Sequence, residues 1–339
     1  MRTAQDQLRQ HRARQSVLTE RDKLLKGADK RIELEKFLPS DGKDTARAVL
    51  ITLGLATVGG IPYMVMVLMW FFNYHKSFPN TLAALVVLIV LSIGMCLAST
   101  KRAMGRERQW LWWQGVLCGQ ATIIGCILGF FLYFRHLAYY WKYEELRTYT
   151  NVAAAQDAVA FGDGSMFLFT EDTHLDPMRA VGYQGRFTGN TFCVAPVVDS
   201  SMTNVQDIYY WAIGENCCSP RAEFHCDDAE DVQTRSALVV LEPEDVVRPF
   251  MRWAVKGATY PKYVEAIKLQ EATYFTKAAI RPKLVYWSRD PIALKDSFYW
   301  AAANICGWFS GFYVFFLYVG TFFIARTLVP KQRKEGVVR

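Results

Sequence analysis

The chain has 339 residues, of which 52% are hydrophobic and 21% are charged, and its formal net charge is +7. Residues 135–296 hold 17 basic and 22 acidic side chains, whereas residues 1–47 hold 12 and 8, residues 101–109 hold 4 and 1, and residues 326–339 hold 5 and 1. The positive charge is therefore confined to certain segments and does not indicate the broadly basic surface of a nucleic-acid-binding protein. We expect no nucleic-acid partner.

The first 47 residues form a charged segment with scattered apolar positions. Leu18, Leu24, Ile32 and Phe37 stand among charges, and the segment ends at Pro39-Ser40-Asp41-Gly42. This pattern predicts one or two amphipathic helices that lie on the inner leaflet or contact a partner, although a merely solvated helix fits the loose spacing equally well. The segment contains no apolar core followed by a cleavage site, so we expect the first span to act as the insertion signal.

Four long stretches carry no charged residue. They are Ala48–Phe72, Thr81–Thr100, Gln109–Phe134 and Ser297–Ala325. Each is long enough to cross about 30 Å of hydrocarbon as a helix, and a buried helix of a soluble protein rarely stays uncharged for this length. The sequence therefore predicts four membrane spans, at residues 48–72, 81–100, 109–134 and 297–325.

The distribution of basic residues predicts the orientation. The three positively charged segments, residues 1–47, 101–109 and 326–339, are expected on the cytoplasmic side, because basic flanks resist translocation. The acidic segment 135–296 is then expected on the opposite side, in the plasma membrane or an internal membrane. Residues 135–143 are rich in Tyr and Trp, which suggests that the third helix continues beyond the bilayer as a stalk.

The spans contain small and amide side chains that suit contacts between helices. Glycines spaced four residues apart allow close approach of helix backbones, and they lead us to expect spans three and four to be the tightest partners. These glycines are Gly115, Gly119, Gly125, Gly129, Gly307 and Gly311. Gln120 and Asn304 are candidates for interhelical hydrogen bonds. The absence of ionisable side chains at mid-span depth argues against a proton-coupled carrier or a charged ion pathway.

Residues 135–296 are predicted to form an α+β domain outside the membrane. Short apolar runs next to Gly, Asp and Asn predict strands and hairpins, and a later change to helical spacing predicts helices. The expected strands are Ala158–Phe161, Met166–Phe169, Thr191–Ala195, Ile208–Ile213, Ser236–Leu241 and Leu284–Trp287, and the expected helices are Pro243–Ala254 and Pro261–Phe275. The segment Gly162-Asp163-Gly164 is interpreted as a hairpin turn between the first two strands.

The four cysteines of this domain are candidates for two disulfides in an oxidising compartment. They are Cys193, Cys217, Cys218 and Cys226. If a strained adjacent bridge is excluded, two pairings remain: Cys193 with Cys217 and Cys218 with Cys226, or Cys193 with Cys218 and Cys217 with Cys226. A zinc site with His225 is the rival interpretation, but the spacing lacks the Cys-x-x-Cys pattern. We expect no metal and no cofactor.

Other candidate chemical motifs are weak. Phe161-Gly162-Asp163-Gly164-Ser165 lacks the Gly-Lys-Ser/Thr ending of a phosphate loop. The acidic run Asp227, Asp228, Glu230 and Asp231 lacks the alternating ligands of a calcium loop. The sequence therefore predicts no catalytic residue and no enzymatic activity.

Two resemblances accompany these features. Four spans with both termini inside, a short first loop and a large second loop with adjacent cysteines resemble the architecture of tetraspanins, although this chain has Cys217-Cys218-Ser219 where tetraspanins have Cys-Cys-Gly. Segments around Cys193, Tyr209-Tyr210-Trp211, Cys217-Cys218 and Cys226 resemble an uncharacterised group of multi-pass membrane proteins from dinoflagellate-type algae. The second resemblance covers mainly the outer domain and implies no activity.

The expected architecture is thus a four-span helical bundle with a disulfide-stapled α+β extracytoplasmic domain between spans three and four. The expected function is interaction with, or organisation of, partners through that domain. An accessory subunit of a channel, transporter or other membrane complex is the alternative. Expected partners are the lipid bilayer and other membrane proteins or further copies of the chain.

Overall fold

The computed structural model describes residues 42–101, 106–185, 189–200, 202, 207–219, 223–242, 246 and 260–335. The chain divides into two compact units, one comprising residues 57–317 and the other residues 1–56 with 318–339. The N-terminal segment up to residue 41, and nearly all of the helix expected over Pro243–Ala254, lie outside the described residues.

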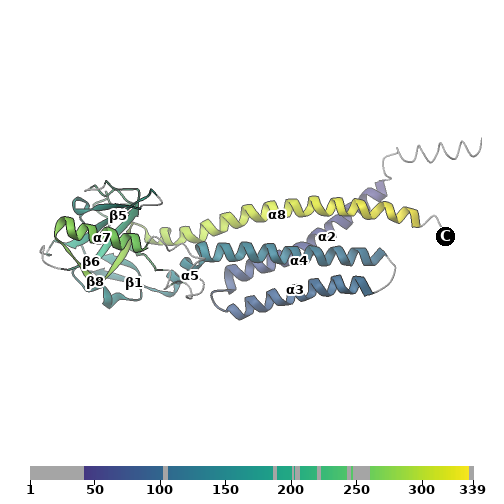
Figure 1. Ribbon diagram of the computed structural model, residues 1–339, viewed down its shortest axis with the longest axis horizontal. Coiled ribbons are helices and arrows are strands. Elements are labelled where there is room, and N and C mark those ends of the chain that lie inside the picture. Colours follow the sequence, from purple (N-terminus) through teal and green to yellow (C-terminus); the bar gives the residue numbers. More distant parts are fainter. Residues whose placement is uncertain are drawn as a thin grey trace, which may run out of the picture. The chain divides into compact units, whose positions relative to one another are not determined.

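Four helices are long and apolar enough to cross a membrane, and they fall where the uncharged stretches predict them (Figure 1). The candidate spans are Val49–Asn73, Phe78–Ser99, Gln109–Glu145 and Pro291–Ala325. They are built from α2 (Gly42–Leu68), η1 (Met69–Asn73), α3 (Phe78–Lys101), α4 (Arg106–Leu132), η2 (Tyr133–Leu137), α5 (Ala138–Glu145) and α8 (Pro291–Glu335). The predicted helical continuation after the third stretch is confirmed, because α4 passes through the π-helical turn η2 into α5 and ends at Glu145.

The glycines of α4 contact α3 and α2. A Cβ atom added at Gly119 would lie 2.7 Å from the Oγ of Ser92, and one added at Gly115 would lie 2.7 Å from the Sγ of Cys96. Ser92 also donates a hydrogen bond of 2.7 Å to the carbonyl oxygen of Gly115. Close backbone approach thus joins α4 to α3.

The next pair of α4 glycines meets α2 and η1. An added Cβ would lie 2.8 Å from the carbonyl oxygen of Tyr63 at Gly125, and 2.5 Å from Cδ1 of Trp70 at Gly129. We expected spans three and four to be the tightest partners, but the α4 glycines contact the first two spans instead. Side chains that meet at this junction include Tyr63, Met66, Trp70, Leu128 and Leu132, all of them buried.

The helix α8 packs on α2 along one side. Tyr63 stacks on Tyr313 with ring centroids 4.2 Å apart, and its hydroxyl lies 2.8 Å from the Oγ of Ser310. A Cβ added at Gly60 would lie 3.3 Å from Cδ2 of Leu317. In the second compact unit, Leu55 and Ala56 of α2 and Thr321 and Ala325 of α8 are buried.

Residues between the third and fourth long helices include an eight-stranded mixed sheet, hereafter the sheet domain (residues 146–290). Its strands are β1 (Arg147–Val152), β2 (Gly164–Phe169), β3 (Thr173–Leu175), β4 (Val181–Gln184), β5 (Thr191–Asp199), β6 (Asp207–Glu215), β7 (Ser236–Val239) and β8 (Lys277–Trp287). The order is β1-β2-β7-β8-β6-β5-β3, with β4 also paired to β5. The pairs β1–β2 and β6–β8 are parallel and the others are antiparallel.

Alternation along the central strands gives the sheet two buried faces. On one face, Phe192, Trp211 and Leu284 pack against Tyr263 and Ile267 of α7 (Tyr260–Tyr274), which covers this side. On the other face, Cys193, Tyr210, Val285 and Trp287 pack with Phe224 and Cys226 from the segment after β6. The predicted α+β character is confirmed.

One predicted strand is wrong. Ala158–Phe161 forms a single turn of 3₁₀ helix, η3, because the side chain of Asp157 accepts a hydrogen bond from the backbone N–H of Val159 and caps the turn. Gly162-Asp163-Gly164 is therefore not a hairpin turn, since β2 pairs with β1 in parallel and with β7. Gly189 and Asn190 lie between the paired strands β4 and β5, and Gly189 has a φ of +68°.

The long helices join the sheet domain through a packed contact. Tyr143 of α5 is buried and donates a hydrogen bond of 2.7 Å to the carbonyl oxygen of Val239 in β7. Around it lie Met166, Leu238, Leu241 and, from α8, Phe298. The side chains of Lys295 and Glu144 form an ion pair between α8 and α5. Both helical connections to the domain are thus fixed by side-chain contacts.

Replacing Gly129 by leucine should lower the melting temperature of the detergent-purified protein. The new side chain would overlap Trp70, and overpacking of this kind costs about 1–3 kcal/mol. Gly94→Leu on α3 is the matched control, because an added Cβ there meets nothing within 4 Å. Scanning fluorimetry of the three proteins checks the expectation, and equal melting temperatures for both variants would contradict the described contact.

Candidate functional site

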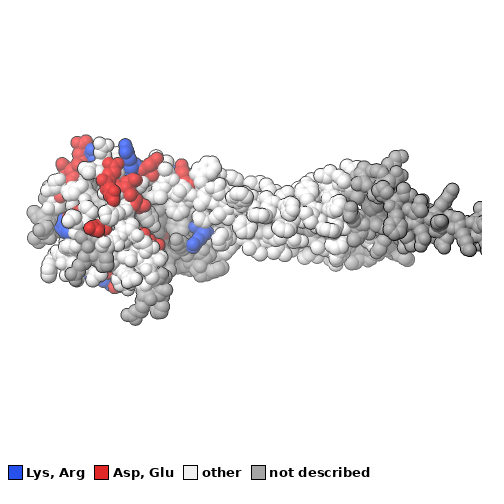
Figure 2. Space-filling view, turned by 90° about the horizontal axis from the view of Figure 1, so that it is seen from above, with Lys and Arg blue, Asp and Glu red and all other residues white. Residues whose placement is uncertain are grey.

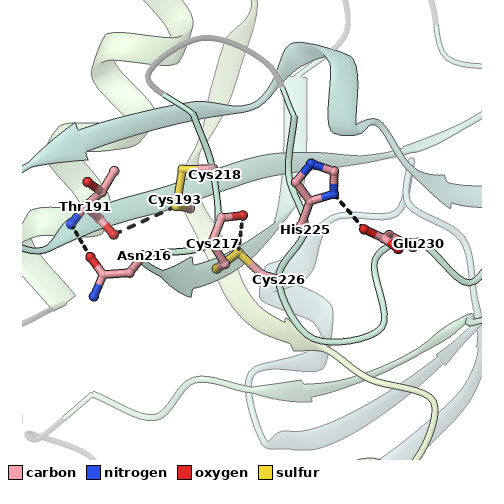
Figure 3. The surroundings of a disulfide bond; sticks show 8 residues. All are labelled: Thr191, Cys193, Asn216, Cys217, Cys218, His225, Cys226 and Glu230. Atoms are coloured by element: carbon pink, nitrogen blue, oxygen red, sulfur yellow. Dashed lines mark hydrogen bonds and ion pairs between the residues drawn. A yellow bond between two sulfur atoms is a disulfide. The ribbon is translucent and has the colours of Figure 1, made fainter.

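The candidate functional site lies around two disulfides at the start of β5 and just after the end of β6. Cys193 is bonded to Cys218 and Cys217 to Cys226, with Cα–Cα distances of 5.8 and 5.0 Å (Figure 3). Of the two pairings that the sequence left open, the structure has the second. Cys96, Cys118, Cys126 and Cys306 are free and lie within the candidate spans.

Local backbone geometry explains why adjacent cysteines take different partners. Asn216 follows β6 with a φ of 57°, a left-handed conformation that Asn tolerates better than most residues. Its backbone N–H donates to the carbonyl oxygen of Thr191, and its side-chain oxygen accepts from the N–H of Thr191, both at 2.8 Å. Cys218 then forms a β-bridge with Phe224. Successive side chains in an extended segment point to opposite sides, so Cys217 and Cys218 reach different sulfurs.

Two glycines leave room for the sulfur atoms. In the sheet register, Cys193 lies between Gly182 of β4 and Gly214 of β6. A Cβ added at Gly214 would lie 2.5 Å from the Sγ of Cys217 and closer still to the Sγ of Cys226. One added at Gly182 would lie 2.9 Å from the Sγ of Cys218. The glycines on both neighbouring strands, which have no side chain, therefore leave the space that the disulfides occupy.

The sulfur atoms are close enough to raise the question of a metal. The Sγ atoms of Cys193, Cys217 and Cys226 lie within 4.8 Å of one another. Metal ligation by cysteine requires the thiolate, which a disulfide does not offer. The disulfide interpretation therefore accounts for the whole cluster, and His225, the fifth residue of the rival zinc site, instead has its Nδ1 2.7 Å from Oε1 of Glu230.

A groove of about 580 Å³ lies beside the Cys217–Cys226 bridge. Its described lining residues are His174, Leu175, Pro177, Met178, Glu223, Phe224, His225, Ala229, Glu230, Asp231, Val232, Thr234 and Trp287. Two apolar side chains of the groove are strongly exposed, Met178 at 70% and Val232 at 97%. Among the described lining residues there are three carboxylates and no lysine or arginine, so the groove combines exposed apolar surface with negative charge.

The acidic loop that forms one wall is held by hydrogen bonds. Oδ2 of Asp228 accepts from the backbone N–H of Arg289 at 2.8 Å, and the guanidinium of Arg289 lies 3.5 Å from Oδ2 of Asp231. Both carboxylates therefore have partners within the protein. Figure 2 shows Asp and Glu side chains gathered on one face of the sheet domain.

A larger cavity of about 990 Å³ lies between α7, β8 and η3. Its polar side chains are mostly paired within the protein: Lys283 donates to the carbonyl oxygen of Gly162, and Glu271 accepts from the N–H of Ala278. A hydrogen bond from the hydroxyl of Tyr149 lowers the pKa of Asp163 below its usual value, and the Arg147 guanidinium adds to this effect. Its described lining residues include no Ser, Thr, Cys or His.

The candidate packing residues of the spans divide into two groups. The α4 glycines make the contacts with α2 and α3 described above, whereas a Cβ added at Gly307 or Gly311 meets nothing within 4 Å. Gln120 and Asn304 are both exposed, and neither side chain forms a hydrogen bond with the described part of the chain. Their interhelical role stays a prediction.

Comparison with known proteins gives no assignment: no family model, curated protein or solved structure matches the chain. Its function must be inferred from its own residues.

Replacing Gly214 by alanine should prevent normal closure of the Cys217–Cys226 bridge, because the new methyl group would occupy the position of its sulfur atoms. Loss of a native disulfide typically costs about 2–5 kcal/mol, so the melting temperature should fall clearly. Gly162→Ala is the control, since the nearest atom to its added Cβ is 3.6 Å away. Peptide mapping of non-reduced protein gives the pairing in each variant. Intact bridges and wild-type stability in Gly214→Ala, or the other pairing in the wild type, would contradict the described site.

Proposed function

We propose that the chain is a non-enzymatic multi-pass membrane protein that binds a partner through the groove beside its disulfides. The sheet domain would lie outside the cytoplasm, and both termini would lie inside it. The observation that carries the proposal is the groove, where the exposed side chains of Met178 and Val232 stand next to Glu223, Glu230 and Asp231 on a disulfide-braced wall. Exposed apolar side chains ringed by charge are typical of protein interaction sites.

The chemistry of the groove favours a partner segment with basic and apolar side chains. Carboxylates at its rim would attract lysine or arginine and speed association, while burial of Met178 and Val232 would supply binding free energy. The paired polar groups of the larger cavity and the lack of ionisable side chains deep in the spans support a binding role over catalysis or ion transport. The tetraspanin-like order of spans and loops also fits an organising role.

A second candidate function is that of an accessory subunit. The same groove would then bind a fixed channel, transporter or other membrane complex. The hydrogen bond of Tyr143 to the sheet domain and the ion pair of Lys295 with Glu144 of α5 favour neither role by themselves, but they would couple a bound partner mechanically to the helices. Stoichiometry separates the two functions, because an accessory subunit stays with one large partner at a constant ratio.

The groove proposal predicts that Glu230→Lys abolishes association with the partner. The variant reverses the charge at the rim without touching a buried side chain, because the Glu230 side chain is 76% exposed. Glu265→Lys on α7 is the matched control, since it reverses another exposed carboxylate that has one ion-pair partner, Lys268. Tagged proteins are purified from native membranes in mild detergent and their composition is read by mass spectrometry. A partner retained by Glu230→Lys, or no copurifying partner of the wild type at any ratio, would overturn the proposal.

The proposed orientation predicts that Ile280 and the two termini lie on opposite sides of the membrane. Ile280 is 99% exposed on β8, so Ile280→Cys gives a reactive thiol far from the disulfides. In cells with a selectively permeabilised plasma membrane, antibodies should reach tags on both termini. An impermeant maleimide should label Ile280→Cys in intact cells if the protein lies in the plasma membrane, and only after full permeabilisation if it lies in an internal membrane. Labelling of Ile280→Cys that is absent in intact cells but appears on selective permeabilisation, together with the terminal tags, would contradict the orientation.

A further inference from the structure

The side of α8 that faces away from α2 is an unpartnered helix face, hereafter the α8 outer face. It comprises Asn304, Gly307, Trp308, Gly311 and Phe315, which recur at intervals of three and four residues and so share one side of the helix. Tyr313, which stacks on Tyr63 of α2, comes nine residues after Asn304, or two and a half turns of about 3.6 residues. The bundle contact and the outer face therefore lie on opposite sides of α8.

The outer face is polar at one position and open at two others. Asn304 is exposed, and its amide has no hydrogen-bond partner in the described part of the chain. Gly307 and Gly311 have open space within 4 Å of an added Cβ, whereas each α4 glycine of the same spacing is packed against a neighbouring helix. Trp308 and Phe315 beside them are 73% and 61% exposed. Glycines four residues apart are thus packed against neighbouring helices on α4, whereas the pair on α8 has open space beside it.

Depth makes the exposed amide significant. The uncharged stretch from Ser297 to Ala325 is about 43 Å long as a helix, so a centred hydrocarbon layer of about 30 Å begins roughly one turn before Asn304. An amide in hydrocarbon is costly unless it is hydrogen-bonded, because lipid tails offer no donor or acceptor. Asn304 therefore requires a partner that the rest of the described chain does not supply.

We propose that the α8 outer face binds the same face of a second copy of this chain, forming a parallel dimer within the membrane. All copies inserted with one orientation present α8 in the same direction, so a two-fold axis along the membrane normal brings identical residues together. The carboxamide of Asn304 has both donors and an acceptor and is self-complementary across such an axis. Gly307 and Gly311 form a Gly-x-x-x-Gly motif in an apolar helix, which allows the two backbones to approach closely.

A second copy fits this face better than an unrelated helix because each residue of the face can contact the same residue of a second copy. The two Asn304 amides can hydrogen-bond to each other, and the glycines of the two helices allow their backbones to approach. Trp308 and Phe315 then pack at the edges of the contact. Gln120 on α4 is also exposed, but its neighbours along that side include Ile123 and Ile127, which are 55% and 65% exposed and would hold a second backbone away. The dimer rests on the proposed membrane placement of α8 and is independent of what binds in the groove.

Cross-linking in native membranes tests the face. Phe315→Cys should form a disulfide-linked dimer under mild oxidation, whereas Phe316→Cys should not, because Phe316 lies about 100° further round the helix. The two positions are matched in exposure, at 61% and 65%. Equal cross-linking at both positions, or a dimer only from Phe316→Cys, would overturn the assigned face. Cross-linking of Phe315→Cys to a different protein would overturn the assignment of a second copy.

Substitution tests the chemistry of the face. Single-molecule photobleaching in lipid vesicles of stated lipid-to-protein ratio should show wild-type dimers. Gly311→Leu should convert them to monomers, and Asn304→Leu should weaken association about tenfold, the scale of one interhelical hydrogen bond. Gly320→Leu is the control, since an added Cβ there also meets nothing within 4 Å but Gly320 lies about 160° from Asn304 on the helix.

The outcomes distinguish this inference from the groove proposal. A monomeric wild type, or a dimer unaffected by Gly311→Leu, would refute the α8 dimer while leaving the groove untouched. Loss of the dimer in Gly320→Leu as well would show that a large side chain anywhere on α8 disrupts association, and would refute the assignment of the dimer contact to the α8 outer face. Glu230→Lys should retain the dimer, because the described lining residues of the groove belong to the sheet domain and none comes from α8.

Discussion

Close approach of backbones at the glycines of α4 is the contact on which the helical part of the molecule depends. In lipid, the hydrophobic effect does not drive apolar helices together, so their association relies on van der Waals contact and interhelical hydrogen bonds. Gly115 and Gly119 admit Ser92 and Cys96 of α3, and Gly125 and Gly129 admit Tyr63 and Trp70. Because two pairs of glycines lie on one helix, α4 can serve both neighbours at once.

The same helix also fixes the sheet domain. It continues without interruption through η2 into α5, where Tyr143 is buried and donates to Val239 of β7. The chain returns to the long helices at Pro291, and the ion pair of Lys295 with Glu144 ties the start of α8 to α5. The sheet domain is therefore attached to the long helices through two connections, α5 and the start of α8. Two connections restrict its motion relative to these helices more than one would.

Much of this architecture follows from local features of the sequence, and the remainder depends on contacts between distant residues. The long helices are predictable because the absence of charge over twenty or more residues is a property of one segment. The short apolar run Thr191–Ala195 predicts the strand β5 for the same reason. By contrast, Ala158–Phe161 has the composition of a strand but forms a 3₁₀ turn that the side chain of Asp157 caps. The strand β1 was missed because its residues are largely polar and exposed, as suits an edge strand.

The cysteine pairing shows why the site itself was only half predictable. The sequence indicated which four cysteines bond but left two pairings open, since both satisfy the exclusion of an adjacent bridge. The choice depends on the register that puts Cys193 between Gly182 and Gly214, and on the turn at Asn216 that directs Cys217 and Cys218 apart. Register is set by strands far apart in the chain, so no local pattern contains it. The groove was missed for the same reason, because its described lining comes from three separate stretches, residues 174–178, residues 223–234 and Trp287.

The two proposed contacts would reinforce each other through the geometry of α8. This helix begins at Pro291, thirteen residues before Asn304, so the proposed dimer contact lies only about 20 Å along one rigid element from the start of the sheet domain's second connection. A dimer held at Asn304 and Gly311 would thus keep two sheet domains, and two grooves, within reach of one partner assembly. Binding at the first groove then raises the effective concentration of the second, and a weak groove can give strong overall attachment. A solitary shallow groove with three carboxylates would bind a basic segment only weakly in physiological salt, because exposed charges are screened over about 8 Å. Pairing through α8 is therefore what would make such a groove effective as an organising site.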